Sequence, residues 1–169
     1  MHDLIILACL EWDWGGVPAV CSAGAAVASA AAAWFSFELS RNQREEELHE
    51  KLNEIIKLSL MYPHVEDAVY IETWPEQWRK YHSNEKRKEL TEEQCKKLLQ
   101  YDYFADVVFN FLSHLYSFYK KDKNKIDNFV NVKDWVRLHR GHWEMHMDDY
   151  ENVDSYDKGF KDFINDYLI

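Results

Sequence analysis

Three histidines lie close together in the run LHRGHWEMH near the carboxyl end of the chain. His142 and His146 have the i, i+4 spacing that lets two imidazoles on one helix face reach a single metal ion, and His139 falls on the same face. Glu144 stands midway between the last two histidines, which differs from the zinc-protease motif His-Glu-x-x-His. The run therefore offers His139, His142 and His146 as ligands of a divalent metal such as zinc. The alternative is that they border an aromatic core and bind carboxylates.

A second set of polar residues follows a spacing of four along one predicted helix: Asp102, Asp106, Asn110 and His114. Carboxylates that project into a helical bundle hold the ions of di-metal oxygen chemistry, but those proteins need a Glu-x-x-His motif from each of two helices. This chain lacks such a pair. A solvated helix face is therefore the simpler interpretation of this polar ladder.

A third candidate site combines aromatic and cationic side chains: Trp74, Trp78, Arg79 and Arg87. An indole ring can stack on a small anionic ligand such as a nucleotide while a guanidinium pairs with its charge. The alternative is a basic segment that lies on the inner leaflet, where anionic lipid attracts each cation by about 1 kcal/mol. The chain has no glycine-rich phosphate loop and no Gly-x-Ser-x-Gly motif. We therefore expect no enzymatic activity, and no cofactor, apart from the metal chemistry considered above.

The composition limits the class of protein. The chain has 169 residues with 20 Lys and Arg against 30 Asp and Glu, a net charge of −10, which argues against non-specific binding of nucleic acid. Only 5 Gly and 3 Pro accompany 47% hydrophobic residues, so disorder and turn-rich β folds are disfavoured. Three Cys exclude a disulfide framework. The length indicates one domain of ordinary size, or a small domain plus an appendage.

The first 40 residues contain no Lys or Arg, and residues 17–37 contain no charged residue at all. A helix of that length spans roughly 30 Å, the thickness of a bilayer core. Trp12 and Trp14 precede the segment and Trp34 lies near its far end. Arg41 and Arg44 follow it, so the positive-inside rule directs the carboxyl-terminal part to the cytoplasm. We predict a single transmembrane helix over 15–39 in the inner membrane, with residues 1–14 outside. A cleaved signal peptide, or a buried alanine-rich helix of a soluble assembly, is the alternative.

Small residues recur at four-residue spacing in this segment, at Gly24, Ala28 and Ala32. Such rows let helix backbones approach closely in lipid, so we predict that the helix self-associates and that the protein is a homo-oligomer. The alternative is that alanine richness reflects compositional bias alone.

The rest of the chain is predicted to be helical. Residues 40–62 read as a stalk that continues the membrane helix until Pro63, and residues 63–169 as an antiparallel bundle. Thr91 and Gln94 have the form of a capping box, which starts a helix reaching about Lys121. A further helix is expected after Asn131, ending near Tyr150, and a last one after Asp154. Residues 68–73 (AVYIET) are the one run that favours an extended conformation.

Three runs after position 60 are distinctive: MYPHVEDAVYIETW, DWVRLHRGHWEMH and the closing FKDFINDYLI. Together with the single apolar helix before them, they resemble uncharacterised bacterial families of short single-pass membrane proteins with a helical cytoplasmic domain. The resemblance implies a bacterial inner-membrane setting and, for some members, a part in antiviral defence. It supplies no catalytic residues.

The sequence therefore leaves three alternative functions. The first is a membrane-anchored oligomeric effector or sensor whose cytoplasmic bundle receives a protein partner or ligand. The second is a structural or accessory subunit of a larger membrane complex. The third is a metal-dependent enzyme built on the histidine cluster.

Overall fold

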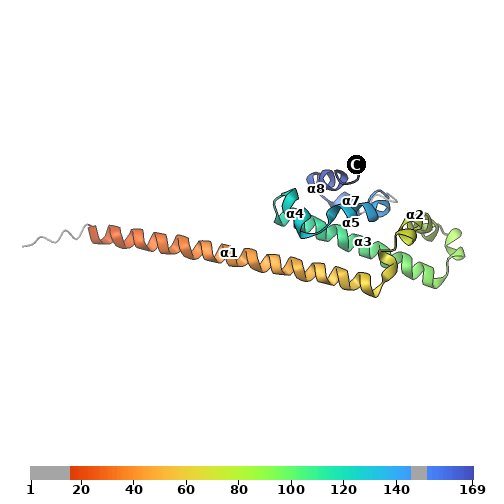
Figure 1. Cartoon of the computed structure of the whole chain (residues 1–169), viewed down its shortest axis with the longest axis horizontal. Coiled ribbons are helices and arrows are strands. Elements are labelled where there is room, and N and C mark those ends of the chain that lie inside the picture. The colour runs from red at the N-terminus through yellow and green to blue at the C-terminus, as the bar shows by residue number, and fades with distance from the viewer. Residues whose placement is uncertain (1–15, 146–151) are drawn as a thin grey trace, which may run out of the picture. The chain divides into compact units, whose positions relative to one another are not determined.

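The computed structural model describes residues 16–145 and 152–169, with only the backbone of residues 16–28, 152 and 154. All regular elements of these residues are helices, so the prediction of an all-α protein is confirmed (Figure 1). In chain order they are α1 (Gly16–Met61), η1 (Pro63–Val65), α2 (Ala68–His82), η2 (Lys86–Glu89), α3 (Glu92–Phe118), α4 (Lys123–Phe129), α5 (Val132–Leu138), α6 (Arg140–Trp143), α7 (Asn152–Ser155) and α8 (Lys158–Asn165).

Helix α1 runs without interruption for 46 residues and ends just before Pro63. One helix therefore covers most of the predicted membrane segment and nearly all of the predicted stalk. The chain divides into two compact units, Met1–Glu47 and Leu48–Ile169, with the boundary inside α1. From Ser29 onward, Leu48 is the first α1 side chain that is buried in the core.

The apolar character of α1 is limited. Among the residues that the structure describes, no helix is both long and apolar enough to span a membrane. The predicted outer segment 1–14 lies outside the described residues.

Helix α3 is the centre of the second unit. Its capping box forms as predicted: Thr91 Oγ1 accepts from the Gln94 amide at 3.2 Å, and Gln94 Oε1 accepts from the Thr91 amide at 2.8 Å. Ten of its side chains are buried, namely Leu98, Tyr101, Phe104, Ala105, Val108, Phe109, Phe111, Leu112, Leu115 and Tyr116. The other helices of the unit supply the remaining core residues around this stripe.

Helix α2 contradicts the expectation of an extended run at 68–73. The Asp67 carboxylate caps the helix by accepting from the amide of Val69 at 2.9 Å. Ile71 and Trp74 are three residues apart and both are buried, so the apolar spacing fits a helix that packs on one face. The β-branched residues of the run favoured a strand locally, and tertiary packing overrides that preference.

The carboxyl-terminal helices are shorter than predicted. Asn131 caps α5 as expected, but α5 ends at Leu138 and a separate short helix, α6, covers Arg140–Trp143. The predicted end near Tyr150 lies outside the described residues. The last helix, α8, begins at Lys158, where Asp157 accepts from the Phe160 amide at 3.0 Å.

The turn after α3 holds two lysines in left-handed backbone conformation, Lys120 with φ 52° and Lys121 with φ 71°. Side chains with a Cβ disfavour this region, whereas glycine adopts it freely. Relief of about 1–2 kcal/mol of left-handed strain exceeds the entropic cost of glycine, about 0.5–1 kcal/mol, so we expect Lys120→Gly and Lys121→Gly each to raise the free energy of unfolding by about 0.5–1 kcal/mol. Urea unfolding followed by circular dichroism measures the change. A loss of stability in both variants would contradict the assigned turn conformation.

Candidate functional site

The predicted metal ligand His139 lies between α5 and α6 and is fully buried. Its Nδ1 is 3.2 Å from the hydroxyl of Tyr101, itself fully buried on α3. Burial, with a smaller contribution from His142, lowers the pKa of His139 to about 3, so the imidazole is neutral at physiological pH. Its Nε2 atom has no hydrogen-bond partner.

The second predicted metal ligand, His142, contacts residues of the polar ladder. His142 Nε2 lies 3.3 Å from Asp102 Oδ1 and 3.6 Å from Asp106 Oδ1, so α6 contacts the polar ladder of α3. The other ladder residues also have partners: Asn110 Oδ1 accepts from the Tyr156 hydroxyl at 2.9 Å, and His114 Nδ1 lies 3.3 Å from Lys51 Nζ. The ladder is therefore partly solvated, since Asn110 and His114 are exposed, and it also contacts neighbouring elements. It joins α3 to three other parts of the second unit.

The described residues do not assemble a metal centre. No group of three or more His, Cys, Asp or Glu among them is placed to hold an ion. His139 faces Tyr101, whereas His142 faces two carboxylates, and His146 lies outside the described residues. The break between α5 and α6 explains the difference, because the predicted common face required one unbroken helix.

The predicted ligand-binding residues form an aromatic stack along α2. Trp74 is buried, its Nε1 donates to the Leu98 carbonyl at 3.3 Å, and its ring stacks on that of Trp78 at 5.1 Å. Trp78 stacks on Tyr81 at 5.4 Å, and the Arg87 guanidinium lies 4.4 Å above the Tyr81 ring. Because Trp74 is covered by neighbouring side chains, it has no free face for a ligand. Arg79 is exposed outside this stack.

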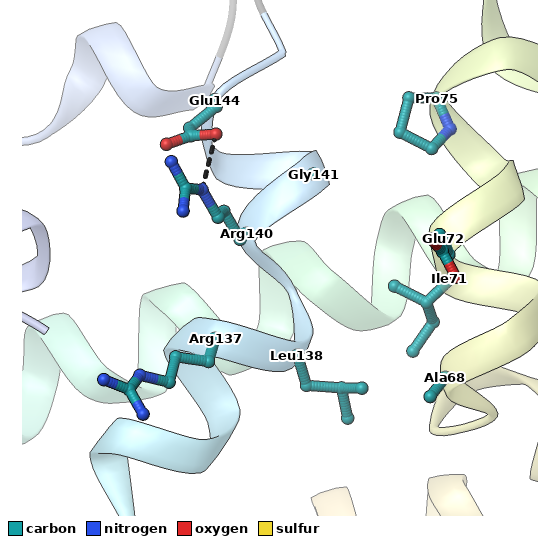
Figure 2. Close-up of a pocket in the computed structure, with 9 residues that line it drawn as sticks. All are labelled: Ala68, Ile71, Glu72, Pro75, Arg137, Leu138, Arg140, Gly141 and Glu144. Atoms are coloured by element: carbon teal, nitrogen blue, oxygen red, sulfur yellow. Dashed lines mark hydrogen bonds and ion pairs between the residues drawn. The ribbon is translucent and has the colours of Figure 1, made fainter. Parts of the chain in front are cut away.

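A cleft that the sequence did not predict lies between α2 and the α5–α6 segment (Figure 2). It has a volume of about 370 Å³. In Figure 2, Ile71 and Leu138 point toward each other from the two sides of the cleft. The full lining is Ala68, Ile71, Glu72, Pro75, Arg137, Leu138, Arg140, Gly141 and Glu144.

The charged residues of the cleft surround its apolar part. Arg140 Nε donates to Glu144 Oε2 at 2.8 Å, and Figure 2 shows both side chains on the flank away from α2. Arg137 Nε donates to the Tyr167 carbonyl at 3.4 Å. Glu72 is exposed on the opposite, α2 side. The cleft therefore offers an apolar surface with charges of both signs around it.

The absence of a side chain at Gly141 lets α6 approach α2 closely. A Cβ atom at this position would lie 3.1 Å from Pro75 Cγ, which is tighter than ordinary van der Waals contact. We expect Gly141→Leu to lower the free energy of unfolding by about 1–3 kcal/mol, because overpacking forces α6 away from α2. Urea unfolding measures this effect, and Lys133→Leu on the exposed side of α5 is the control. Equal stability of the two variants would contradict the close approach.

A smaller cleft of about 290 Å³ lies between α2 and the start of α3. Its lining is more polar: Tyr70, Thr73, Gln77, Gln94, Lys97 and Leu98. The Tyr70 hydroxyl is buried without a hydrogen-bond partner, and burial raises the pKa of Tyr70 to about 12. This group therefore remains a neutral donor at physiological pH.

The residues predicted to mediate self-association lie on α1. Ala32 is exposed, and Gly24 and Ala28 belong to the part of α1 that is described by its backbone alone.

Comparison with family models, with curated proteins and with solved structures finds no match to this chain. The resemblance to short bacterial membrane proteins therefore stays a prediction.

Proposed function

We propose that the protein is a membrane-anchored helical receptor, held at a bilayer by residues 17–37 and receiving a ligand or protein partner on the unit 48–169. The observation that carries the proposal is the exposure of three aromatic residues in the first unit. Trp34, Phe35 and Phe37 are 65%, 73% and 60% exposed in the isolated chain. Large exposed apolar side chains of this kind indicate a surface that binds lipid or another protein.

The distribution of these side chains around α1 favours lipid. At 3.6 residues per turn, Trp34, Phe35 and Phe37, together with exposed Leu39, spread over roughly 200° of the helix circumference. A helix that packs against one partner buries an apolar stripe of about 100°. A bilayer surrounds the whole helix, and aromatic rings favour the headgroup region. The residues that follow this segment, 40–47 (SRNQREEE), are polar and favour an aqueous environment.

The proposed topology follows from the charges. Arg41 and Arg44 come directly after the apolar segment, so residues 40–169 are proposed to be cytoplasmic and the amino terminus to lie outside. The row of Gly24, Ala28 and Ala32 is proposed to pair copies of the helix in the membrane. A Gly24→Leu variant should then lose self-association in detergent while the second unit remains folded.

The receiving surface is proposed to be the cleft between α2 and α5–α6. Its volume of about 370 Å³ falls in the range of small-molecule pockets, which is about 300–1,000 Å³. It also fits one large side chain of a partner protein. The apolar centre would supply affinity, and the surrounding Arg and Glu side chains would orient the bound group.

Flotation of the purified full chain with neutral phosphatidylcholine vesicles tests the anchor. The unchanged chain should float with the vesicles, and a variant with Trp34, Phe35 and Phe37 all replaced by Ser should float less. Leu60 and Met61 are also exposed on α1 but belong to the second unit, so Leu60→Ser/Met61→Ser is the matched control. A loss of flotation in the control equal to that in the aromatic variant would contradict the proposal.

A further inference from the structure

The turn between α3 and α4 concentrates positive charge in an acidic protein. We name Lys120, Lys121, Lys123 and Lys125 the lysine turn; all four are exposed, whereas the chain as a whole has a net charge of −10. A local cluster of cations in such a chain attracts anions that the rest of the surface repels.

The lysine turn lies at a defined end of the second unit. The His49 ring stacks on that of Phe129 in α4 at 4.4 Å, and Lys51 Nζ lies 3.3 Å from His114 near the end of α3. The turn is therefore at the end where the chain enters this unit at Leu48. In the chain, only residues 38–47 separate that point from the uncharged segment.

The charges of the turn are little compensated. Lys120 and Lys121 form no ion pair with any residue that the structure describes, and Lys123 Nζ lies over the Tyr167 ring at 4.1 Å. Lys125 is 3.6 Å from Asp122. Two nearby carboxylates offset part of this charge, although each also accepts a hydrogen bond: Asp127 from the Tyr167 hydroxyl, and Asp157 from the Phe160 amide. The lysine ammonium groups thus keep donors available to an anion.

The backbone of the turn gives a second, independent reason to assign it a role. Lys120 and Lys121 have φ angles of 52° and 71°, where glycine would be unstrained. Two consecutive lysines in this region lower the stability of the turn. Local strain of this kind is frequent at functional positions, which favours a role for these two side chains.

We infer that the lysine turn binds the anionic phospholipid headgroups of the membrane that holds residues 17–37. The inference rests on the proposed function, because residues 38–47 would tether this end of the unit to the anchored segment. Each ammonium group is attracted to phosphate oxygens, and the attraction falls off within a Debye length of about 8 Å at physiological salt. Binding would limit the orientations of the second unit and leave the far end of α3 free for partners.

Lysine acetylation of the full chain in lipid nanodiscs tests the inference. In discs with phosphatidylglycerol, Lys120, Lys121 and Lys123 should react about fivefold more slowly than in pure phosphatidylcholine discs. Lys86 and Lys88 are the internal control, since η2 lies at the other end of α3, about 40 Å away at 1.5 Å per residue. Their rates should be the same in both discs. High salt should abolish the difference at the turn.

A matched pair of variants distinguishes an effect of lost charge from an effect of unfolding. Lys120→Gly/Lys121→Gly removes two charges and relaxes the backbone, so lost protection of Lys123 cannot come from unfolding. Lys86→Ala/Lys88→Ala removes two exposed lysines elsewhere and should keep the protection of Lys123.

The possible outcomes separate the inference from the proposed function. Equal acetylation rates in both kinds of disc, with the chain firmly incorporated, would overturn the inference alone. The same protection by soluble glycerol phosphate in neutral discs would also overturn it, since the turn would then bind free anions. A chain that does not enter neutral discs would instead contradict the membrane anchor.

Discussion

Replacing Trp74 by alanine is expected to lower the free energy of unfolding by about 3–5 kcal/mol. Trp74 is 1% exposed, its ring stacks on Trp78, and it lies 5.0 Å from the Tyr101 ring and 5.4 Å from the His142 ring. The substitution leaves a large cavity among α2, α3 and α6 and removes the hydrogen bond to Leu98.

Urea unfolding in mild detergent, followed by near-ultraviolet circular dichroism, measures this loss. Tyr103→Ala is the control, because Tyr103 is an aromatic residue of α3 that is 67% exposed. The control should change the free energy of unfolding by less than about 0.5 kcal/mol. A similarly small change for Trp74→Ala would show that α2 does not pack on α3 through this ring.

Acidification is expected to destabilise the second unit through His139. The pKa of His139 is lowered to about 3 in the folded protein by burial, against about 6.5 in the unfolded chain. Between these values the unfolded state binds a proton that the folded state excludes. The stabilisation is therefore complete above pH 6.5 and is lost progressively as the pH falls toward 3. At 1.36 kcal/mol per pKa unit, the whole loss is about 4–5 kcal/mol, and about 2 kcal/mol is lost by pH 5.

Urea unfolding at a series of pH values tests this dependence. His139→Leu costs stability at pH 7, because the Tyr101 hydroxyl loses its partner, but it should remove the slope between pH 6.5 and 5 that His139 causes. His82→Leu is the matched control, because His82 is exposed, and it should keep the slope. If the slope were the same in all three proteins, His139 would not be buried in its neutral form.

The features predicted from the sequence are those that local interactions determine. The capping box of Thr91 and Gln94 needs only four consecutive residues, and it fixes the start of α3. The end of α1 before Pro63 likewise follows from the missing amide of proline. The buried residues of α3 also recur every three or four positions, a period that is visible in the chain itself.

The features that the sequence did not predict depend on contacts between distant segments. The helix break at His139 separates the histidines that a single helix would have aligned. The contact of His142 with Asp102 and Asp106 joins residues about forty positions apart, and no short sequence pattern predicts such a contact. The cleft also depends on two helices, although Gly141 within a predicted helix was a hint of close packing.

The topology and the receptor role both require that residues 17–37 are anchored in lipid, and fractionation of cells that express the intact chain tests this directly. Membranes are collected and washed with alkaline carbonate, which removes peripheral proteins and leaves inserted ones. We predict that the full chain stays with the washed membranes and that detergent is required to extract it. Recovery of the intact chain in the soluble fraction without detergent would contradict the anchor, the topology and the proposed receptor role together.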